Sequence, residues 1–403
     1  MLKKRLVALA ALGTLAPVTL AACGSDPSPS TATVDSLTVL DYYTDEPTTS
    51  QVQALAEKCG AAIGTKINRT TVPGASLIQK VLQQASSKTL PDVLMLDNPD
   101  IQQIAATGAL APLGDYGVKT DGYASGPVSA ATYEGKLYGL QPAANTIAIF
   151  YNKDVLAKAG VTPPATWADL KSTAKTLTVG DQYGFAFNAT ADFEGAWQFL
   201  PPMWTNGGDE TQLADPQVAE ALALWKDLVD SGVSSKSVVT WSQGDVNDQF
   251  IAGKAAMMLN GPWQISSLEE AKVNFGVVPF PINKSGQTST APLGGEAWTV
   301  PQTGNQAKMS KAADFVKCMN TDENQMQRAK EGGLVPTKLA LADKFKTEVP
   351  AMSGFVEAVA QARARTGKLG EKWPDTAKVI YTGMQLVLTG QAAPTDAMAK
   401  AGG

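Results

Sequence analysis

Histidine is absent from the 403 residues of this chain, and cysteine occurs only three times. Without an imidazole ring the chain cannot form a Ser/His/Asp or Cys/His triad, a histidine-ligated zinc or haem site, or a histidine general base. Any catalysis would have to use carboxylates, Lys, Tyr or a cofactor. A basic excess is also lacking, since the formal net charge is −5, whereas binding to nucleic acid needs a basic surface. The composition therefore excludes histidine-based catalysis and argues against nucleic acid as a partner.

What the chain does have is length and apolar content. Hydrophobic residues make up 44% of the sequence, which is ample for a buried core. A chain of this length usually divides into about two domains. We find no internal repeat at the periods typical of solenoids.

The first 22 residues have the pattern of an export signal. Three basic residues at positions 3–5 precede an apolar stretch from 6 to 20 that is too short and interrupted to span a membrane comfortably. The stretch ends in Leu-Ala-Ala-Cys23, which resembles the bacterial lipobox, where the cysteine becomes the diacylated, palmitate-bearing first residue. Two acyl chains give a stable anchor. The alternative is a chance cysteine in an ordinary secretory signal. Residues 23–36, rich in Ser, Thr and Pro, predict a flexible tether.

Two further cysteines, Cys59 and Cys318, lie in the predicted mature chain. An even number of cysteines in an exported protein favours one disulfide, and two buried free thiols are the alternative. Neither cysteine belongs to a C-x-x-C pair, so we expect no thiolate metal site.

Strand and helix patterns alternate three times between residues 37 and 106. The predicted strands are 37–40, 66–72 and 90–96. Each is followed by apolar residues at helical spacing, and this alternation is typical of a mostly parallel sheet covered on both faces. Ligands of such sheets bind beyond the carboxyl ends of the strands, which lead here into residues 43–46 and 97–98.

A second alternation begins in the middle of the chain. The predicted elements are a strand at 147–151, a helix at 167–177 capped by Thr166, a helix between Pro216 and Gly232 with Trp225 on its apolar face, strands at 273–278 and 298–300, and a mainly helical tail from 355. The fold class predicted from both halves is α/β.

Five segments carry motifs that together resemble one family. The most specific is residues 250–263, with the pattern F-x-x-G-x-A-A-M-x-x-x-G-x-W, and the others are 90–113, 135–167, 294–298 and 332–336. In this order they resemble the bacterial extracellular solute-binding proteins of ABC importers, the family of sugar-binding lipoproteins that includes maltose-binding protein. The match spans nearly the whole predicted mature chain.

The resemblance implies a type II periplasmic-binding-protein fold, with two α/β lobes, a cleft, and three crossings between the lobes. We expect these crossings near residues 142–145, 291–294 and 333–336, where Gly and Pro occur. The predicted domains are lobe 1, residues 37–143 and 293–333, and lobe 2, residues 144–292 and 334–403. This arrangement also places both remaining cysteines in one lobe, each on a predicted helix, which favours the disulfide.

The resemblance further implies a binding protein and not an enzyme. The expected protein is a monomer without cofactor or metal, exported and held by lipid at the outer face of the cytoplasmic membrane. It would capture a mono- or oligosaccharide by lobe closure and deliver it to the ABC permease. The chain lacks the G-x-x-x-x-G-K-[ST] motif, so the ATPase must be another chain. The alternatives are the same fold binding a polyamine, a phosphate ester or another solute, or a carboxylate-based glycoside hydrolase.

A sugar site needs aromatic faces for C–H groups and carboxylates or amides for hydroxyls. By analogy with relatives, Trp263 beside the small Gly261 is the first candidate stacking platform, and Trp373 is the second. Asn145, six positions before Tyr151, falls where relatives carry a polar ligand-contacting residue. The alternative for either tryptophan is core packing.

The remaining candidates lie at strand ends, in loop-like segments and at a crossing. They are Asp97 and Asn98 after a buried strand, Glu194 and Trp197 in a loop-like segment, Gly295 and Trp298 at the second crossing, and Tyr43 and Glu46 in the first strand's loop. Asp97 and Asn98 have helix capping as their alternative role, and Trp298 has hinge packing. Trp167 and Trp225 are predicted to pack, while Trp204 and Trp241 have no predicted role.

Overall fold

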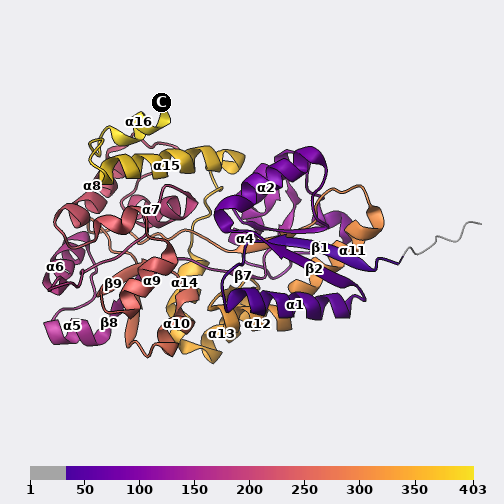
Figure 1. The fold of residues 1–403 in the computed structure, drawn as a ribbon, viewed down its shortest axis with the longest axis horizontal. Coiled ribbons are helices and arrows are strands. Elements are labelled where there is room, and N and C mark those ends of the chain that lie inside the picture. Colours follow the sequence, from indigo (N-terminus) through magenta and orange to yellow (C-terminus); the bar gives the residue numbers. More distant parts are fainter. Residues whose placement is uncertain (1–32) are drawn as a thin grey trace, which may run out of the picture. The chain divides into compact units, whose positions relative to one another are not determined.

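The computed structural model describes residues 33–403 (Figure 1). The predicted export signal, the predicted lipidation site Cys23 and all but the end of the predicted tether lie outside these described residues. From residue 33 onward, no helix is both long enough and apolar enough to cross a membrane.

A five-stranded sheet organises one half of the described fold. Its strands, in spatial order, are β2 (Lys66–Thr71), β1 (Ser36–Asp41), β3 (Val93–Asp97), β11 (Glu296–Thr299) and β6 (Gly139–Leu140). β1 runs parallel to β2 and β3, whereas β11 is antiparallel to β3 and β6. The three early strands predicted from the sequence are confirmed. The late strand β11 returns to this sheet after more than a hundred residues elsewhere in the fold.

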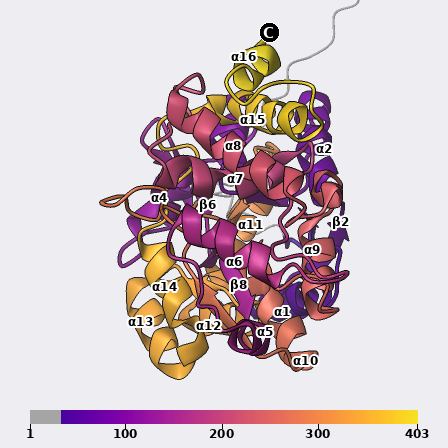
Figure 2. The ribbon, with the colours of Figure 1, turned by 90° about the vertical axis from the view of Figure 1, so that its left-hand side faces the viewer.

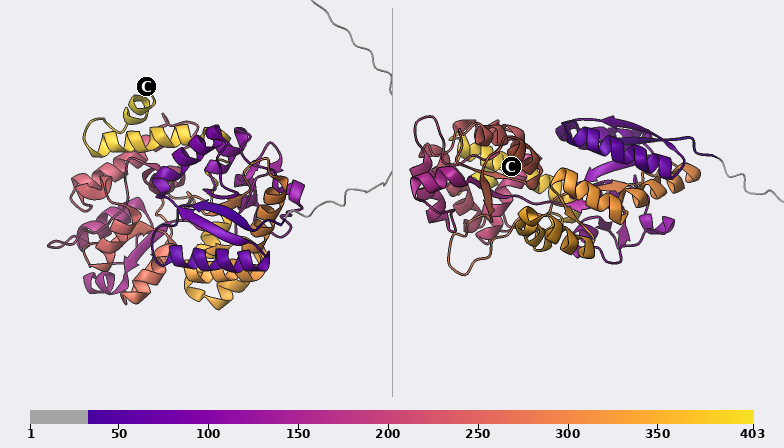
Figure 3. Two further views of the ribbon diagram at one scale, coloured as in Figure 1. Left: turned by 45° about the vertical axis from the view of Figure 1, so that its right-hand side comes forward. Right: turned by 90° about the horizontal axis from the view of Figure 1, so that it is seen from below.

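Helices cover both faces of this sheet. They are α1 (Thr48–Ala62), α2 (Gly74–Ser87), α3 (Asp100–Ala106), α11 (Gln306–Met319) and α12 (Asp322–Gly332). Side chains alternate across a strand, so Val39 of β1 packs with Val52 and Phe315, while its neighbour Leu40 packs with Leu77 on the opposite face. In Figure 3 the indigo α1 runs beside the orange helices α11 and α12. A disulfide joins Cys59 of α1 to Cys318 of α11, so the predicted disulfide is present.

A second, antiparallel sheet has the order β10 (Phe275–Val278), β8 (Ala148–Asn152) and β9 (Met257–Asn260). One side of this sheet packs against helices that lie towards the viewer in Figure 2. Trp225 and Trp167 are buried among these helices, as predicted. These helices are α6 (Trp167–Leu177), α7 (Phe193–Thr205), α8 (Pro216–Asp230) and α15 (Trp373–Leu388). On the other side lie α9 (Gln243–Ile251), α13 (Leu339–Glu348) and α14 (Ser353–Ala360).

The shorter elements complete the described chain. They are α4 (Ser125–Ala130), α5 (Lys153–Ala159), α10 (Ile265–Glu270), α16 (Ala397–Gly402), β4 (Thr132–Tyr133), β5 (Lys136–Leu137), β7 (Ala143–Ala144), β12 (Val335–Pro336), and the 3-10 turns η1 (Leu113–Tyr116), η2 (Lys236–Val239), η3 (Pro262–Gln264), η4 (Pro350–Met352) and η5 (Gly370–Lys372). Thr166 caps α6 as predicted, because its side chain accepts a hydrogen bond from the backbone N–H of Asp169.

We call the five-stranded sheet with its helices the first lobe, and the three-stranded sheet with its helices the second lobe. Three segments between them run side by side. β7 pairs with β12, and Asn145 exchanges two backbone hydrogen bonds with Gly294. These are the segments in which the sequence places the three crossings, and the residue boundaries of the lobes remain a prediction.

Candidate functional site

The ends of three strands of the first lobe bring acidic and tyrosine side chains together. β1 and β3 are parallel and end at the same edge, and Asp97 pairs in register with Glu296 at the start of β11. The hydroxyls of Tyr42 and Tyr43 donate to the two carboxylate oxygens of Glu296 at 2.5 and 2.7 Å. Burial and the charge of Glu296 hold the pKa of both tyrosines well above the ordinary value, so both remain donors.

Other side chains pack against Tyr43 and Trp298 in this network. The guanidinium of Arg328 lies 5.1 Å from the centre of the Tyr43 ring. Trp298 is 3% exposed and meets Phe315 edge-on with ring centres 5.7 Å apart. A cavity of about 10 Å³ beside these side chains has room for about one water molecule and none for a sugar. The binding roles predicted for Tyr43 and Trp298 stay predictions, and neither presents an open face here.

Asp97 and Asn98 contact an arginine from the other end of the chain. The Nη2 atom of Arg365 lies 3.0 Å from both carboxylate oxygens of Asp97 and 3.2 Å from the side-chain oxygen of Asn98. Pro99, not either of these residues, occupies the N-cap of α3, which has no side-chain cap. The alternative role of capping is therefore absent.

The same arginine stacks on a tryptophan of the second lobe. The guanidinium carbon of Arg365 lies 4.3 Å from the centre of the Trp197 ring. We call Asp97, Asn98, Trp197 and Arg365 the junction, because it joins side chains of the first lobe to side chains of α7 and of the chain before α15. Arg365 is 4% exposed, and its Nε atom is buried without a partner among the described residues.

The carboxylates at the junction are shifted towards their protonated forms. Burial raises the pKa of Asp97, against the opposing charge of Arg365. Burial and the neighbouring charge of Asp97 raise the pKa of Asp100, at the start of α3, to about 7. Asp100 beside the junction is therefore a carboxyl group that exchanges its proton near neutral pH.

Two glycines allow the crossing segments to approach the junction. A Cβ atom on Gly294 would lie 2.0 Å from the side-chain oxygen of Asn145 and 2.6 Å from the Trp197 ring. Gly295 has φ +116°, and a Cβ there would lie 2.1 Å from the amide nitrogen of Gln141. The carbonyl oxygen of Gly295 accepts from the backbone N–H of Asn98. The structure thus brings the predicted residues Asn145, Trp197, Gly295 and Asn98 together.

Trp263 and Gly261 lie beside the third crossing. Trp263 is partly exposed on η3, and its ring covers Gly261 so closely that a Cβ there would lie 2.0 Å from ring carbon Cζ3. Gly333 of the third crossing approaches the carbonyl of Pro262 in the same way. The ring also borders the apolar core of the second lobe. Its role as a platform stays a prediction.

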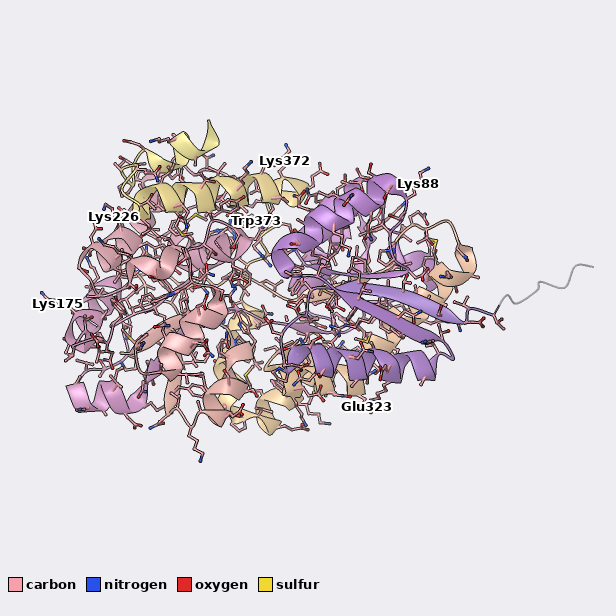
Figure 4. All side chains as sticks on the ribbon, viewed as in Figure 1. Lys88, Lys175, Lys226, Glu323, Lys372 and Trp373 are labelled. Atoms are coloured by element: carbon pink, nitrogen blue, oxygen red, sulfur yellow. A yellow bond between two sulfur atoms is a disulfide. The ribbon has the colours of Figure 1, made fainter. Side chains whose placement is uncertain are left out.

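Trp373 and Lys372 lie on opposite sides of the first turn of α15 (Figure 4). Trp373 is 1% exposed within the core of the second lobe, and its indole N–H has no partner among the described residues. The predicted second platform therefore has no open face here.

Glu194, Glu46 and the segment around Trp197 differ from the expected picture. Glu194 is exposed and accepts from the amide of Asn188, and Glu46 is exposed and accepts from Ser50. Neither side chain forms a hydrogen bond or ion pair with a junction residue within the described part of the chain. The prediction of a loop-like segment around Trp197 is wrong, because Asp192 caps α7 and residues 193–205 are helical.

Sequence reasoning missed Arg365 and the residues that hold it. The chain has five arginines among its 33 basic residues, and two of them stand at 363 and 365. This pairing of a scarce residue was the available signal. We call residues 363–372 the strap, because both lobes contact it.

The strap is bound to the second lobe through Glu210, which also bonds Trp204, a residue with no predicted role. Arg363 bonds both carboxylate oxygens of Glu210 at 2.7 and 2.5 Å, and the indole N–H of Trp204 donates to the same carboxylate at 2.8 Å. Lys368 pairs with Asp209 and, although burial opposes it, lowers the pKa of Asp209 to about 2. These contacts fix the backbone on either side of Arg365.

No group of three or more His, Cys, Asp or Glu side chains within the described part of the chain is arranged to hold a metal ion. The arrangement provides hydrogen-bonding carboxylates, amides and an indole face between two α/β lobes. Such a two-lobed α/β architecture, with polar and aromatic groups where the lobes meet, is the type II periplasmic-binding-protein fold.

Comparisons with known proteins agree with this class. A family model described as bacterial extracellular solute-binding protein matches residues 54–357, and the chain belongs to this family. It is 30% identical over 339 residues to the maltooligosaccharide ABC transporter solute-binding lipoprotein of Streptococcus pneumoniae (strain ATCC BAA-255 / R6), covering 78% of each chain.

Solved structures show the same fold. The GacH receptor of Streptomyces glaucescens, determined unliganded and with acarbose, is 28% identical, with a TM-score of 0.81 over 92% of this chain and 97% of that one. Maltose-bound T. maritima MalE3 has a TM-score of 0.83 over 92% and 98% of the two chains, and at 22% identity it supports the fold alone.

Proposed function

We propose that this protein captures a carbohydrate, a mono- or oligosaccharide, outside the cytoplasm and delivers it to the membrane permease of an ABC transporter. The observation that carries the proposal is the junction, where Arg365 bonds the carboxylate of Asp97 and the amide oxygen of Asn98 and lies over the indole ring of Trp197. Sugars need hydrogen-bonding groups for their hydroxyls and a flat aromatic surface for their C–H faces. The relatives named for maltooligosaccharide and acarbose support the same ligand class.

Capture requires closure of the lobes and no chemical step. A ligand bound to one lobe gains contacts with the other, so it shifts the equilibrium between open and closed forms by its difference in affinity for the two. Gly294 and Gly295, which lie beside Asn145 and Trp197, supply a narrow crossing at which such a movement can take place. The lobe boundaries of this proposal are 37–143 with 293–333, and 144–292 with 334–403.

Membrane attachment is part of the same proposal. The Leu-Ala-Ala-Cys23 motif would place two acyl chains at the start of the mature protein, and residues 23–36 would connect them to β1. A related protein bears the name lipoprotein, which supports this arrangement. The lipid would hold a monomeric binding protein next to its permease.

The ligand class is tested by thermal unfolding and calorimetry. We expect malto- or galactooligosaccharides to raise the melting temperature, since a ligand at a hundred times its Kd stabilises the folded state by about 2.7 kcal/mol. Spermidine and glycerophosphocholine test the charged alternatives. If only a charged solute raises the melting temperature, the carbohydrate assignment fails while solute capture stands. Steady release of shorter sugars on long incubation would instead indicate a glycoside hydrolase.

Two tryptophan variants locate the site. Trp197→Ala and Trp263→Ala should each weaken saccharide binding by about 1 kcal/mol or more, the value of a lost stacking surface. Trp241→Ala removes a partly buried tryptophan that is not one of the four junction residues, so it serves as the matched control. Unchanged affinity in the Trp197 variant would remove the junction from the binding site.

A further inference from the structure

The small cavity beside Tyr43 has no assigned role and lies next to all three predicted crossings. Its volume is about 10 Å³. Pro142 and Ala143 of the first crossing line it, as does Leu334 of the third. Glu296, another lining residue, stands two positions after the second crossing. A molecule bound in this cavity would therefore contact the segments that connect the lobes.

One wall of the cavity comes from Arg328 on α12. Arg328 is 6% exposed, and its Nη1 atom is buried without a hydrogen-bond partner among the described residues. Gly332, one turn further along α12, leaves room for this atom, because a Cβ there would lie 2.3 Å from Nη1. Although burial opposes it, interaction with Tyr43 and Glu296 holds the pKa of Arg328 above its ordinary value, so the guanidinium stays charged. A buried charged donor without a partner is destabilising.

Acceptors for such a donor line the same cavity. The two carboxylate oxygens of Glu296 accept from the hydroxyls of Tyr42 and Tyr43. Each of these oxygens can accept a further hydrogen bond, because an ionised carboxylate offers about four acceptor positions. The hydroxyl oxygen of Tyr43 can also accept. The cavity therefore presents one unpaired donor group and two acceptor groups.

Size and charge select what the cavity can hold. About 10–15 Å³ is the smallest volume that accommodates a water molecule, which needs two to four polar partners. The volume and the polar groups here meet this minimum and leave no room for a larger solute. A cation would face the charge of Arg328, and an anion would face the carboxylate of Glu296. The chemistry therefore favours a small neutral molecule.

We propose that this cavity binds one ordered water molecule, which accepts a hydrogen bond from Nη1 of Arg328 and donates one to the carboxylate of Glu296. The water links α12, which leads into the third crossing, to the start of β11, which follows the second. It is present whichever solute the protein captures, because its partners lie outside the junction.

High-resolution crystallography of the wild type, from crystals grown with bromide in place of chloride, tests the site directly. We expect one density peak within hydrogen-bond distance of both Nη1 of Arg328 and a carboxylate oxygen of Glu296, without the anomalous signal of bromide. A bromide signal would make the ligand an anion and overturn the proposal. A direct ion pair between Arg328 and Glu296, with no density between them, would overturn it as well.

Deuteron magnetic relaxation dispersion of the solvent, which counts long-lived internal waters, supplies the second test. Arg328→Met removes the donor and keeps a long unbranched side chain, so the variant should hold one long-lived water fewer than the wild type. Lys330→Met on the same helix removes an exposed lysine that pairs with Glu348, and it is the matched control with an unchanged count. The same count in Arg328→Met as in the wild type would contradict the proposal. If Arg328→Met does not fold, the wild-type crystals decide the question alone.

Discussion

Gly294 shows how one residue without a side chain positions two with functional side chains. The indole of Trp197 and the amide of Asn145 both occupy space that any other residue at 294 would need. Trp197 then presents its ring to Arg365 at a centroid distance of 4.3 Å. The absence of a Cβ is therefore a condition for the junction.

The first prediction follows from this contact. Gly294→Ala should weaken saccharide binding at least about tenfold and destabilise the fold by about 1–3 kcal/mol, because the added methyl displaces both neighbours. Calorimetry and urea unfolding measure the two effects. Gly114→Ala is the control, since a Cβ there meets nothing within 4 Å and should leave binding unchanged. Wild-type affinity in Gly294→Ala would show that Asn145 and Trp197 are not ligand contacts.

The second prediction concerns Asp100 and pH. Burial and the charge of Asp97 raise the pKa of Asp100 in the folded state from 3.8 to about 7. Between these two pH values the folded protein therefore holds a proton on Asp100 that the unfolded chain has lost. The contribution of Asp100 to the free energy of unfolding should therefore increase as the pH falls from above 7 towards 4, by at most about 1.4 kcal/mol per pH unit.

Asp100→Asn should make the free energy of unfolding depend less on pH between about 4 and 7. Denaturant unfolding across this pH range measures the effect. Asp121→Asn removes an exposed carboxylate of the same lobe and should keep the wild-type slope. Parallel profiles for wild type and Asp100→Asn would contradict the shift.

The sequence led to part of the site because part of it follows strand ends. Asp97 ends the buried strand β3 and Asn98 follows it, and Asn145 and Gly295 stand in segments with family motifs. Arg365 could not be found in this way. Arg365 lies in an irregular segment more than 260 residues from its partner Asp97, and only the folded chain shows that the two meet.

At the scale of elements, the disulfide ties together two helices that are far apart in the sequence. Cys59 on α1 and Cys318 on α11 are separated by 259 residues, and Cys59 is fully buried in the core beneath these helices. A crosslink that closes so long a loop restricts the unfolded chain strongly.

The third prediction is that Cys59→Ser/Cys318→Ser lowers the free energy of unfolding by about 2–5 kcal/mol. Saccharide affinity should stay within about twofold, because neither helix contributes a side chain to the junction. Denaturant unfolding with and without reductant measures the first effect, and the wild type under reductant should approach the variant. Equal stability of oxidised and reduced wild type would contradict the prediction.

Helical and strand periodicity located most elements, and the exceptions have physical reasons. The sequence did not predict α7, which contains Pro201 and Pro202, and prolines inside a helix remove N–H donors. Its residues 195–205 are all buried, and this packing outweighs the lost hydrogen bonds. The return of β11 to the first sheet was not visible in local patterns and followed only from the family resemblance.

At the scale of the whole described fold, the strap is the element through which the second lobe contacts the first. Glu210 and Trp204 hold Arg363, and two residues later Arg365 bonds Asp97. Because the strap is fixed on the second lobe, movement of that lobe must carry Arg365 with it. We therefore expect closure of the lobes to depend on the ion pair between Arg365 and Asp97.

The fourth prediction tests this role of the ion pair. Arg365→Gln should weaken binding of saccharides of every length by about tenfold, because the carboxylate of Asp97 loses its partner on closure. The side chain of Asp97 is 28% exposed, so the loss should fall below the 3–5 kcal/mol typical of fully buried pairs.

The measurement combines calorimetry with small-angle scattering, which should show less compaction of Arg365→Gln at equal saccharide concentration. Lys226→Gln breaks an exposed ion pair with Asp230 on α8 and is the matched control, with an expected effect on binding near zero. A double-mutant cycle with Asp97→Asn separates the pair from its surroundings, because the effect of Arg365→Gln should be smaller when Asp97 is already neutral. If Arg365→Gln binds and compacts like the wild type, closure does not depend on this contact.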